Sequence, residues 1–255
     1  MARKVAFVAG GALALCAVAV GIVLLTRGGE KKAAPPPPPP VAPTRLERVQ
    51  GLAARVPEGR RIALRAKPEG RVLATVGPRT EFGSRQTFAV AFRKGDWVAV
   101  RSPMLGNGQV GWVHASSLRV VRRRLRIDVD LSQRKLTVVF PKGAVMGGRV
   151  VPAVMELSVA VGAPETPTPP GEFYVTDKLR GADFGPYYGC CILALSGRQP
   201  HLPRGWSGGD RLAIHGSRNP DSGQAVTNGC LHLPGYVLTT LMKIVPLGTA
   251  VRIHA

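Results

Sequence analysis

Hydrophobic and polar positions follow three different patterns along the chain. An unbroken apolar run fills residues 5–25. Residues 58–121 carry short stretches in which apolar and polar residues alternate between glycine- and proline-containing turns, and residues 122–255 continue this alternation on longer stretches. Alternation of this kind is typical of half-buried β-strands. The pattern therefore predicts a mainly β protein with two β domains, 58–121 and 122–255, behind a hydrophobic N-terminal segment.

One segment of the second domain has helical spacing instead. Between residues 236 and 245 the apolar positions recur every three or four residues, and Pro246 follows directly. This spacing places the apolar side chains on one face of a helix, and proline cannot continue it. We expect a single helix here, with an apolar face made of Val237, Leu238, Leu241, Met242 and Val245.

The run at residues 5–25 is long enough, as a helix, to cross a hydrocarbon core of roughly 30 Å, and cationic residues flank it. We expect residues 1–32 to form a cytoplasmic tip and a single-pass transmembrane helix, with the rest of the chain outside the cytoplasm. Two alternatives stay open: a signal peptide cleaved after the small residues 17–19, which would release a secreted protein, and lipidation at Cys16.

Residues 33–57 contain six consecutive prolines, 35–40. A proline run adopts the extended polyproline II helix, which rises about 3.1 Å per residue and acts as a stiff spacer. We therefore expect residues 33–57 to be a Pro-rich extended linker that holds the β domains away from the membrane.

The chain is strongly basic, with 35 Lys and Arg against 15 Asp and Glu and a net charge of +20. Such a charge favours anionic surroundings: nucleic acid, lipid headgroups or acidic polymers. Placement outside the cytoplasm argues against nucleic acid. Anionic polymers and headgroups remain as partners for the basic first domain and for the arginine cluster at 122–124.

The second domain contains a histidine and a cysteine, two residue types that can together carry out acyl transfer. His215 closes a strand-like run, and Cys230 follows Gly229. A thiol must lose its proton to become a nucleophile, and an imidazole can take that proton and return it to a leaving group. The preceding glycine lets the backbone turn its N–H groups toward a developing oxyanion.

The remaining cysteines and histidines indicate neither a metal site nor a disulfide framework. No cluster of His and Cys has metal-ligand spacing, so we expect no metal and no cofactor. Cys190 and Cys191 are neighbours in a predicted strand, where side chains point to opposite faces, so we do not expect them to bond to each other. Residues 197–209 lack a regular pattern and are expected to be a mobile lid or a surface loop.

Several separate motifs of the second domain occur in one characteristic order: TPTPPGEF at 166–173, GPYYG at 185–189, IHG at 214–216, TNGC at 227–230 and PLGTAVRI at 246–253. With them, residues 125–254 resemble the YkuD-type catalytic domain of L,D-transpeptidases, a β-sandwich with one helix. The GWV sequence at 111–113, with Trp97 and Leu118, resembles the small β-barrel of bacterial SH3-like domains. Trp97 and Trp112 would either line a peptide groove or pack in the core of that barrel.

The resemblance implies a role for each matched residue. Cys230 would be the nucleophile and His215 the general base and then the general acid. The Gly216 carbonyl would hold the His215 tautomer, and backbone N–H groups of Asn228, Gly229 and Cys230 would form the oxyanion hole. Substrate contacts would come from Tyr187 or Tyr188 in the donor cleft, and from Thr227 and His232.

Two positions depart from the commonest pattern of the family. Asn228 stands where histidine is frequent, and His232 stands where arginine or asparagine is usual. These departures bear on acceptor contacts and on pH dependence.

The resemblance implies an enzyme that cross-links peptidoglycan without a metal or other cofactor. Its activity would serve cell-wall biogenesis and the maintenance of cell shape. Carbapenems would acylate it. A tetrapeptide stem would lose D-alanine to form a thioester at Cys230, and a second stem's amine would resolve it. Anionic wall polymers would be additional partners. Two alternatives remain: an L,D-carboxypeptidase that only hydrolyses, and a non-catalytic wall-binding protein that uses the SH3-like domain.

Overall fold

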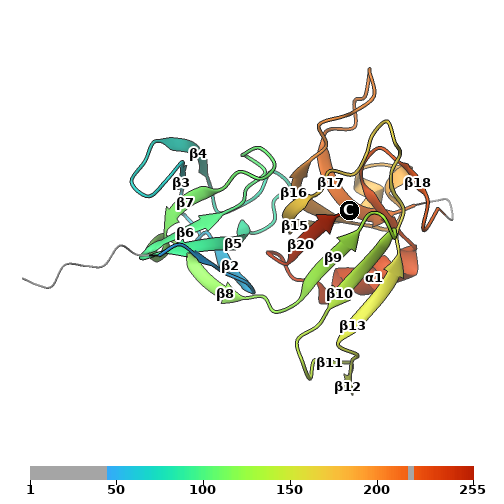
Figure 1. The fold of residues 1–255 in the computed structure, drawn as a ribbon, viewed down its shortest axis with the longest axis horizontal. Helices are drawn as coiled ribbons and strands as arrows, with labels where there is room; N and C mark the ends of the chain where they lie inside the picture. The colour runs from blue at the N-terminus through green and yellow to red at the C-terminus, as the bar shows by residue number, and fades with distance from the viewer. Residues whose placement is uncertain (1–44, 218–220) are drawn as a thin grey trace, which may run out of the picture. The chain divides into compact units, whose positions relative to one another are not determined.

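The computed structural model describes residues 45–217 and 221–255, which Figure 1 draws in colour. The predicted transmembrane helix and the six prolines of the linker lie outside these residues. Within the described part, no helix has the length and apolar character needed to cross a membrane.

The first sheet is entirely antiparallel and runs in the order β4-β3-β7-β6-β5-β2-β8, with β1 also paired to β5. Its strands are β1 (Glu47–Arg48), β2 (Leu52–Arg55), β3 (Ile62–Arg65), β4 (Val72–Val76), β5 (Thr87–Lys94), β6 (Trp97–Val100), β7 (Gly111–His114) and β8 (Arg119–Arg122), with the short 3₁₀ helix η1 (Ala115–Ser117) before β8. The strands expected over 58–121 are present, and the resemblance of this region to SH3-like domains stays a prediction.

The structure corrects the end of the predicted linker. Strands β1 and β2 lie within residues 33–57, and β2 pairs with both β5 and β8. Ala53 and Ala54 of β2 are fully buried. The strand is short, and its buried residues are two adjacent small alanines, so no alternation predicts it from the sequence.

The second sheet runs in the order β13-β10-β9-β20-β15-β16-β17-β19, and Figure 1 shows its long curved strands. Pairing is antiparallel except between β9 and β20 and between β17 and β19. The strands are β9 (Arg126–Asp130), β10 (Lys135–Val139), β13 (Val154–Ser158), β15 (Gly171–Arg180), β16 (Cys191–Arg198), β17 (Arg211–Gly216), β19 (Leu231–Leu233) and β20 (Ala250–His254). Smaller pairs are β11 (Val145–Met146) with β12 (Arg149–Val150), and β14 (Val161–Gly162) with β18 (Ala225–Thr227).

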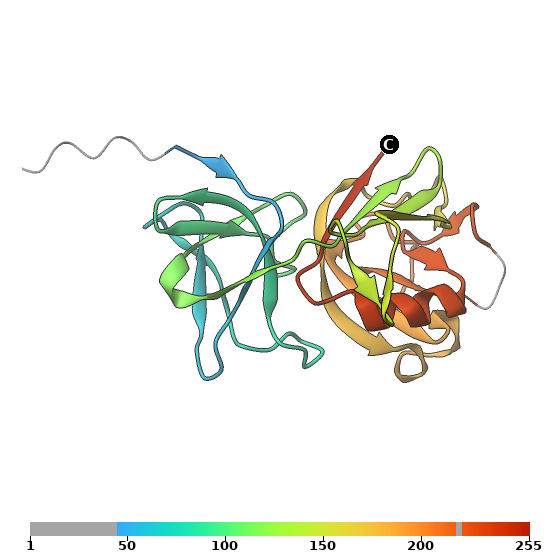
Figure 2. The same ribbon diagram turned by 90° about the horizontal axis from the view of Figure 1, so that it is seen from below.

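The helix α1 (Gly235–Ile244) lies where the sequence predicts it, within one residue at each end. It packs against β16 and β17, and Figure 2 shows it running beside the strands of the second sheet. Val237, Leu238 and Leu241 are its buried residues, as the spacing predicts. Val245 ends the helix in an extended conformation before Pro246.

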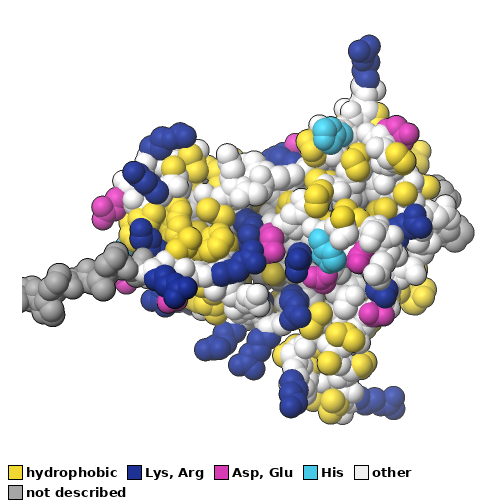
Figure 3. All heavy atoms as spheres, viewed as in Figure 1, with side chains coloured by type: hydrophobic (Ala, Val, Ile, Leu, Met, Phe, Trp, Pro, Cys, Tyr) yellow, Lys and Arg dark blue, Asp and Glu magenta, His cyan; other side chains and the backbone are white. Residues whose placement is uncertain are grey.

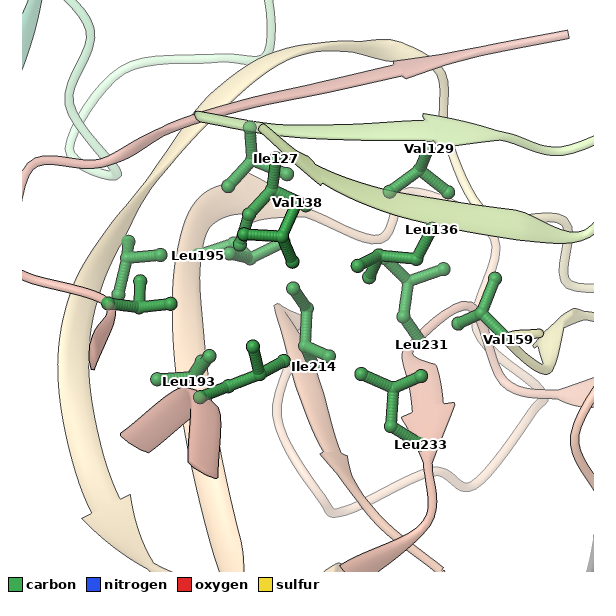
Figure 4. Close-up of a cluster of buried hydrophobic side chains, with 14 of the residues drawn as sticks. Ile127, Val129, Leu136, Val138, Val159, Leu193, Leu195, Ile214, Leu231 and Leu233 are labelled. Atoms are coloured by element: carbon green, nitrogen blue, oxygen red, sulfur yellow. The ribbon is translucent and has the colours of Figure 1, made fainter. Parts of the chain in front are cut away.

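Alternate residues of the strands build one hydrophobic core with this helix. Ile127 and Val129 of β9 and Leu136 and Val138 of β10 are all buried and face the same interior. Figure 4 shows these side chains pointing toward those of the central strands. The other labelled members of the cluster are Val159, Leu193, Leu195, Ile214, Leu231 and Leu233. Ile214, which precedes His215, and Leu231, which follows Cys230, are thus fixed by the core.

The structure contradicts the prediction for the paired cysteines, because Cys190 and Cys191 form a disulfide with each other. The prediction assumed that both lie in one strand, where neighbours point apart. Instead β16 begins at Cys191, and Cys190 follows Gly189, whose φ of 61° turns the backbone out of the extended conformation. The turn removes the strand alternation at this position.

The core contribution of α1 is testable with two substitutions on the same helix. Leu238→Ala empties a fully buried position, and we expect it to lower the free energy of unfolding by about 2–5 kcal/mol. Thr240→Ala changes an exposed residue two positions away and should shift stability by less than about 0.5 kcal/mol. Urea unfolding followed by circular dichroism measures both. Equal effects would show that α1 does not anchor this core.

Candidate active site

Parallel pairing of β17 with β19 brings together two motifs that are separate in the sequence. In this pairing Ile214 lies opposite Leu231, and His215 lies opposite His232. Cys230 directly precedes β19, after the turn at residues 228–229. The buried Ile214 and Leu231 hold the register, since a slip of one residue would turn both of them out of the core. The register therefore places His215, Cys230 and His232 at one site.

The His215 ring is buried and has one defined tautomer. Its Nδ1 lies 2.6 Å from the Gly216 carbonyl oxygen. A carbonyl only accepts, so Nδ1 donates and Nε2 keeps the lone pair that a general base needs. Burial, followed by the neighbouring His232, lowers the pKa of His215 to about 4 from its ordinary 6.5. The hydrogen bond to Gly216 opposes this shift.

The Cys230 thiol is partly buried and protonated. Its sulfur makes a weak hydrogen-bonding contact of 3.9 Å with the Arg211 carbonyl oxygen. Loss of solvation raises the pKa of Cys230 to about 11, against a smaller lowering by a backbone hydrogen bond from Ala213. Within the described residues no hydrogen bond joins this sulfur to His215. The resting site therefore holds a neutral thiol beside a neutral imidazole.

Of the two tyrosines that the resemblance implies for the donor cleft, the structure brings Tyr188 to the site. Its ring centroid lies 4.9 Å from that of His215. Tyr188 and Cys230 also pack on the same small cluster, Ile192, Ala194 and Ala213. Burial raises the pKa of Tyr188, and the nearby Cys230 raises it further. Tyr187 is 79% exposed, so it does not line the site with its neighbour.

Two residues expected to face substrate or oxyanion are used inside the turn instead. The Gly229 N–H donates to Thr227 Oγ1 at 3.0 Å, and the Thr227 hydroxyl donates to the Cys230 carbonyl at 2.6 Å. Both Thr227 and Gly229 are buried. Thr227 therefore braces the turn that leads to Cys230, and the Gly229 N–H is not free for an oxyanion hole. Asn228 is exposed.

Gln199 is a residue of this site that sequence reasoning misses. Its side chain is buried, and its amide nitrogen lies 3.2 Å from the Thr166, 3.0 Å from the Pro167 and 3.2 Å from the Asn228 carbonyl oxygens. Its amide oxygen accepts from the His201 N–H. The beginning of the region expected to be a lid or surface loop is therefore fixed to the turn before Cys230. No sequence spacing reveals such contacts, because they join a side chain to distant backbone.

Asp221 is a second residue that the sequence does not single out. One of its carboxylate oxygens lies 2.6 Å from Nδ1 of His232. The His232 ring centroid lies 4.4 Å from that of His215.

Across residues 45–217 and 221–255, no group of three or more His, Cys, Asp or Glu side chains has the geometry to hold a metal ion.

The position and order of these elements agree with a known family. Residues 124–253, about half the chain, match the YkuD family, described as an L,D-transpeptidase catalytic domain. The chain belongs to the YkuD family. YkuD of Bacillus subtilis is 37% identical over 99 residues, which cover 38% of this chain and 51% of that protein. YqjB of the same organism is 35% identical over 106 residues, covering 38% and 57%. The chain spans about half the length of these curated relatives.

Solved structures of L,D-transpeptidases are also similar to this YkuD chain. L,D-transpeptidase 3 from Mycobacterium tuberculosis is 19% identical, with 59% of this chain and 70% of that chain covered and a TM-score of 0.37. An L,D-transpeptidase from Mycobacterium smegmatis is 16% identical, with 66% and 93% covered and a TM-score of 0.36.

The fit between Gly229 and Gln199 predicts an unequal response of two glycines. Both Gly229 and Gly223 have positive φ, but a Cβ at Gly229 would lie 2.0 Å from the Gln199 amide nitrogen, whereas one at Gly223 meets nothing within 4 Å. Gly223→Ala should cost about 1–2 kcal/mol of stability through conformation alone. Gly229→Ala should cost roughly 1–3 kcal/mol more, because of overpacking. Thermal unfolding separates the two, and equal losses would contradict the contact.

The buried His215 predicts an acid-sensitive stability. The folded-state pKa of about 4 lies below the ordinary 6.5, so between these values the unfolded chain binds a proton that the folded chain does not. The free energy of unfolding should therefore fall as pH drops from 7 to 4, by about 3 kcal/mol from this group. Urea titrations at both pH values, on wild type and His215→Asn, isolate this contribution. An identical pH dependence in the two proteins would contradict it.

Proposed function

We propose that this protein is a cysteine L,D-transpeptidase that cross-links peptidoglycan stem peptides. One observation carries the proposal: within a YkuD domain, parallel strands hold a histidine of fixed tautomer beside the turn that ends in Cys230. The Nε2 lone pair of His215 is free to act as a base, and Cys230 is the free thiol in the described part of the chain.

The first half-reaction acylates Cys230. Nε2 of His215 takes the thiol proton as the sulfur attacks the carbonyl carbon between the third residue of a tetrapeptide stem and its terminal D-alanine. Backbone N–H groups around Cys230 stabilise the oxyanion of the tetrahedral intermediate. When the C–N bond breaks, His215 returns the proton to the leaving amine. D-Alanine departs, and the stem remains as a thioester on the sulfur.

The second half-reaction transfers the stem. A side-chain amine from the third residue of another stem attacks the thioester carbonyl, and His215 takes the proton that the amine loses. The C–S bond breaks, the thiolate regains that proton, and an amide joins two third residues. If water attacks instead, the product is a tripeptide and the enzyme is an L,D-carboxypeptidase.

Neutrality of the resting pair gives the reaction its timing. The pKa of His215 lies near 4 and that of Cys230 near 11, so an imidazolium–thiolate pair is unfavourable before substrate binds. Proton transfer therefore accompanies attack on the carbonyl, when charge moves onto the oxyanion and not onto sulfur. A thiol kept protonated in this way also resists oxidation between turnovers.

The setting of the enzyme is part of the proposal. Residues 1–32 would anchor the chain in the cell membrane, and the proline run of 33–57 would project the β domains toward the wall. The described surface suits anionic wall polymers: Figure 3 shows many more Lys and Arg than Asp and Glu side chains on the visible face. The basic cluster at 122–124 and the first sheet are the expected contact regions.

Turnover of a defined stem tests the proposal. Full-length protein in detergent is incubated with disaccharide-tetrapeptide, and products are identified by mass spectrometry. Cross-linked dimers that have lost D-alanine are expected. Cys230→Ala should abolish them, and His215→Asn should lower the rate roughly a thousandfold. Tyr187→Phe, at an exposed position beside the site, should leave the rate unchanged.

Each outcome separates the candidate functions. Tripeptide without dimer would identify a carboxypeptidase. Absence of turnover, with wild type and Cys230→Ala indistinguishable, would contradict both enzymatic functions and leave a wall-binding protein. A carbapenem adduct on the peptide that contains Cys230 would independently show a competent nucleophile.

A further inference from the structure

A second imidazole lies against the base of the site and is held by a carboxylate. His232 stands beside His215 in the parallel register, with the ring centroids 4.4 Å apart and the planes inclined by 51°. Its Nδ1 lies 2.6 Å from Asp221. The side chains of His232 and Asp221 are only 17% and 14% exposed. A polar pair placed this deeply costs desolvation, so its position beside the base calls for a function.

The hydrogen bonds define the tautomers of both rings. A carboxylate and a carbonyl oxygen accept, so Nδ1 carries the proton in His232, toward Asp221, and in His215, toward Gly216. Each ring is thus anchored through Nδ1, and neither can flip without losing its hydrogen bond. His232 is further fixed by its backbone, which exchanges two hydrogen bonds with Ala160.

Asp221 supplies the negative charge near the base. The titratable groups that act on or contact His215 are His232 on β19, Tyr188 on η3 (Pro186–Tyr188), the Cys230 thiol and Asp221. Tyr188 and Cys230 are neutral. Burial and then His232 disfavour a proton on His215, and Asp221 is the carboxylate that favours one. A buried imidazolium without a compensating charge is costly. The carboxylate offsets that cost at the moment His215 receives the thiol proton.

We propose that Asp221 and His232 form a positioning couple for His215. Asp221 orients the His232 ring, and that ring packs on His215, fixes its orientation and brings the carboxylate's charge close to the imidazolium formed in each half-reaction. The couple acts through His215 and needs no contact with substrate. This inference rests on the proposed function, because it assigns the couple to the acylation and deacylation steps.

The rate of Cys230 acylation by a carbapenem, read by mass spectrometry of the full-length protein, tests the couple. We expect Asp221→Asn to lower the first-order acylation constant about tenfold while the apparent affinity for the carbapenem stays unchanged. Asp221→Glu, which keeps the charge, should recover the rate to within about threefold. Asp183→Asn makes the same chemical change in the exposed pair with Arg180 and should have no effect.

A double-mutant cycle shows whether the two residues act as one unit. His232→Asn alone should lower the acylation constant about as much as Asp221→Asn, and the double variant should be no slower than His232→Asn. Independent, multiplying losses would overturn the couple. So would a loss confined to affinity, or an Asp221→Asn protein that acylates at the wild-type rate with the wild-type melting temperature.

A spectroscopic measurement keeps the inference separate from the proposed function. Long-range ¹H–¹⁵N spectra at pH 7 report the tautomer of each ring, and we expect an Nδ1–H signature for His232 that is lost in Asp221→Asn and kept in Asp221→Glu. An Nε2–H tautomer in wild type would overturn the couple whatever the activity. Wild-type protein that forms no Cys230 adduct and turns over no stem would instead contradict the proposed function.

Discussion

The parallel pairing of β17 with β19 is the constraint on which the site depends. A parallel pair needs a crossover connection, so His215 and Cys230 must be separated in sequence to be neighbours in space. The core fixes this pairing, because Ile214 and Leu231 are buried opposite each other. His215 and His232 form the next pair along the two strands. The same backbone ladder that stabilises the second sheet therefore sets the spacing of His215, Cys230 and His232.

Burial has opposite effects on the pKa values of His215 and Cys230, and in the proposed mechanism these effects keep the pair neutral until a substrate binds. It lowers the pKa of His215 and raises that of Cys230, so both groups are neutral at neutral pH. Within the positioning couple, His232 adds to the lowering of the His215 pKa, and Asp221 opposes it. Neither residue contributes to the raised pKa of Cys230. In the proposed mechanism the substrate's carbonyl oxygen takes the negative charge as the C–S bond forms, so no free thiolate is needed.

The strands and the helix can be predicted from the periodicity of hydrophobic residues, because they depend on local sequence. Alternating hydrophobicity predicts the β-strands of both regions, and helical spacing at 236–245 predicts α1, observed at Gly235–Ile244. Motif chemistry points to Cys230 and His215, which the structure brings to one site, and their catalytic roles stay a prediction. Contacts that depend on the tertiary fold are different: nothing near Gln199 or Asp221 in the sequence indicates the carbonyls or the imidazole that they bind. The disulfide between Cys190 and Cys191 is not predicted either, because Cys190 lies before β16, where strand alternation does not hold.

Gln199 illustrates how narrow the chemical choice at a buried position becomes. Its amide nitrogen faces three carbonyl oxygens, from Thr166, Pro167 and Asn228, while its amide oxygen faces an N–H. Glutamate has nearly the same shape, yet an ionised carboxylate donates no hydrogen bond and would set a negative oxygen against three others. Deamidation, a slow spontaneous reaction of ageing proteins, makes this very exchange. Buried Gln199 holds the turn before Cys230 in place. The integrity of that turn therefore depends on the lifetime of one side-chain amide.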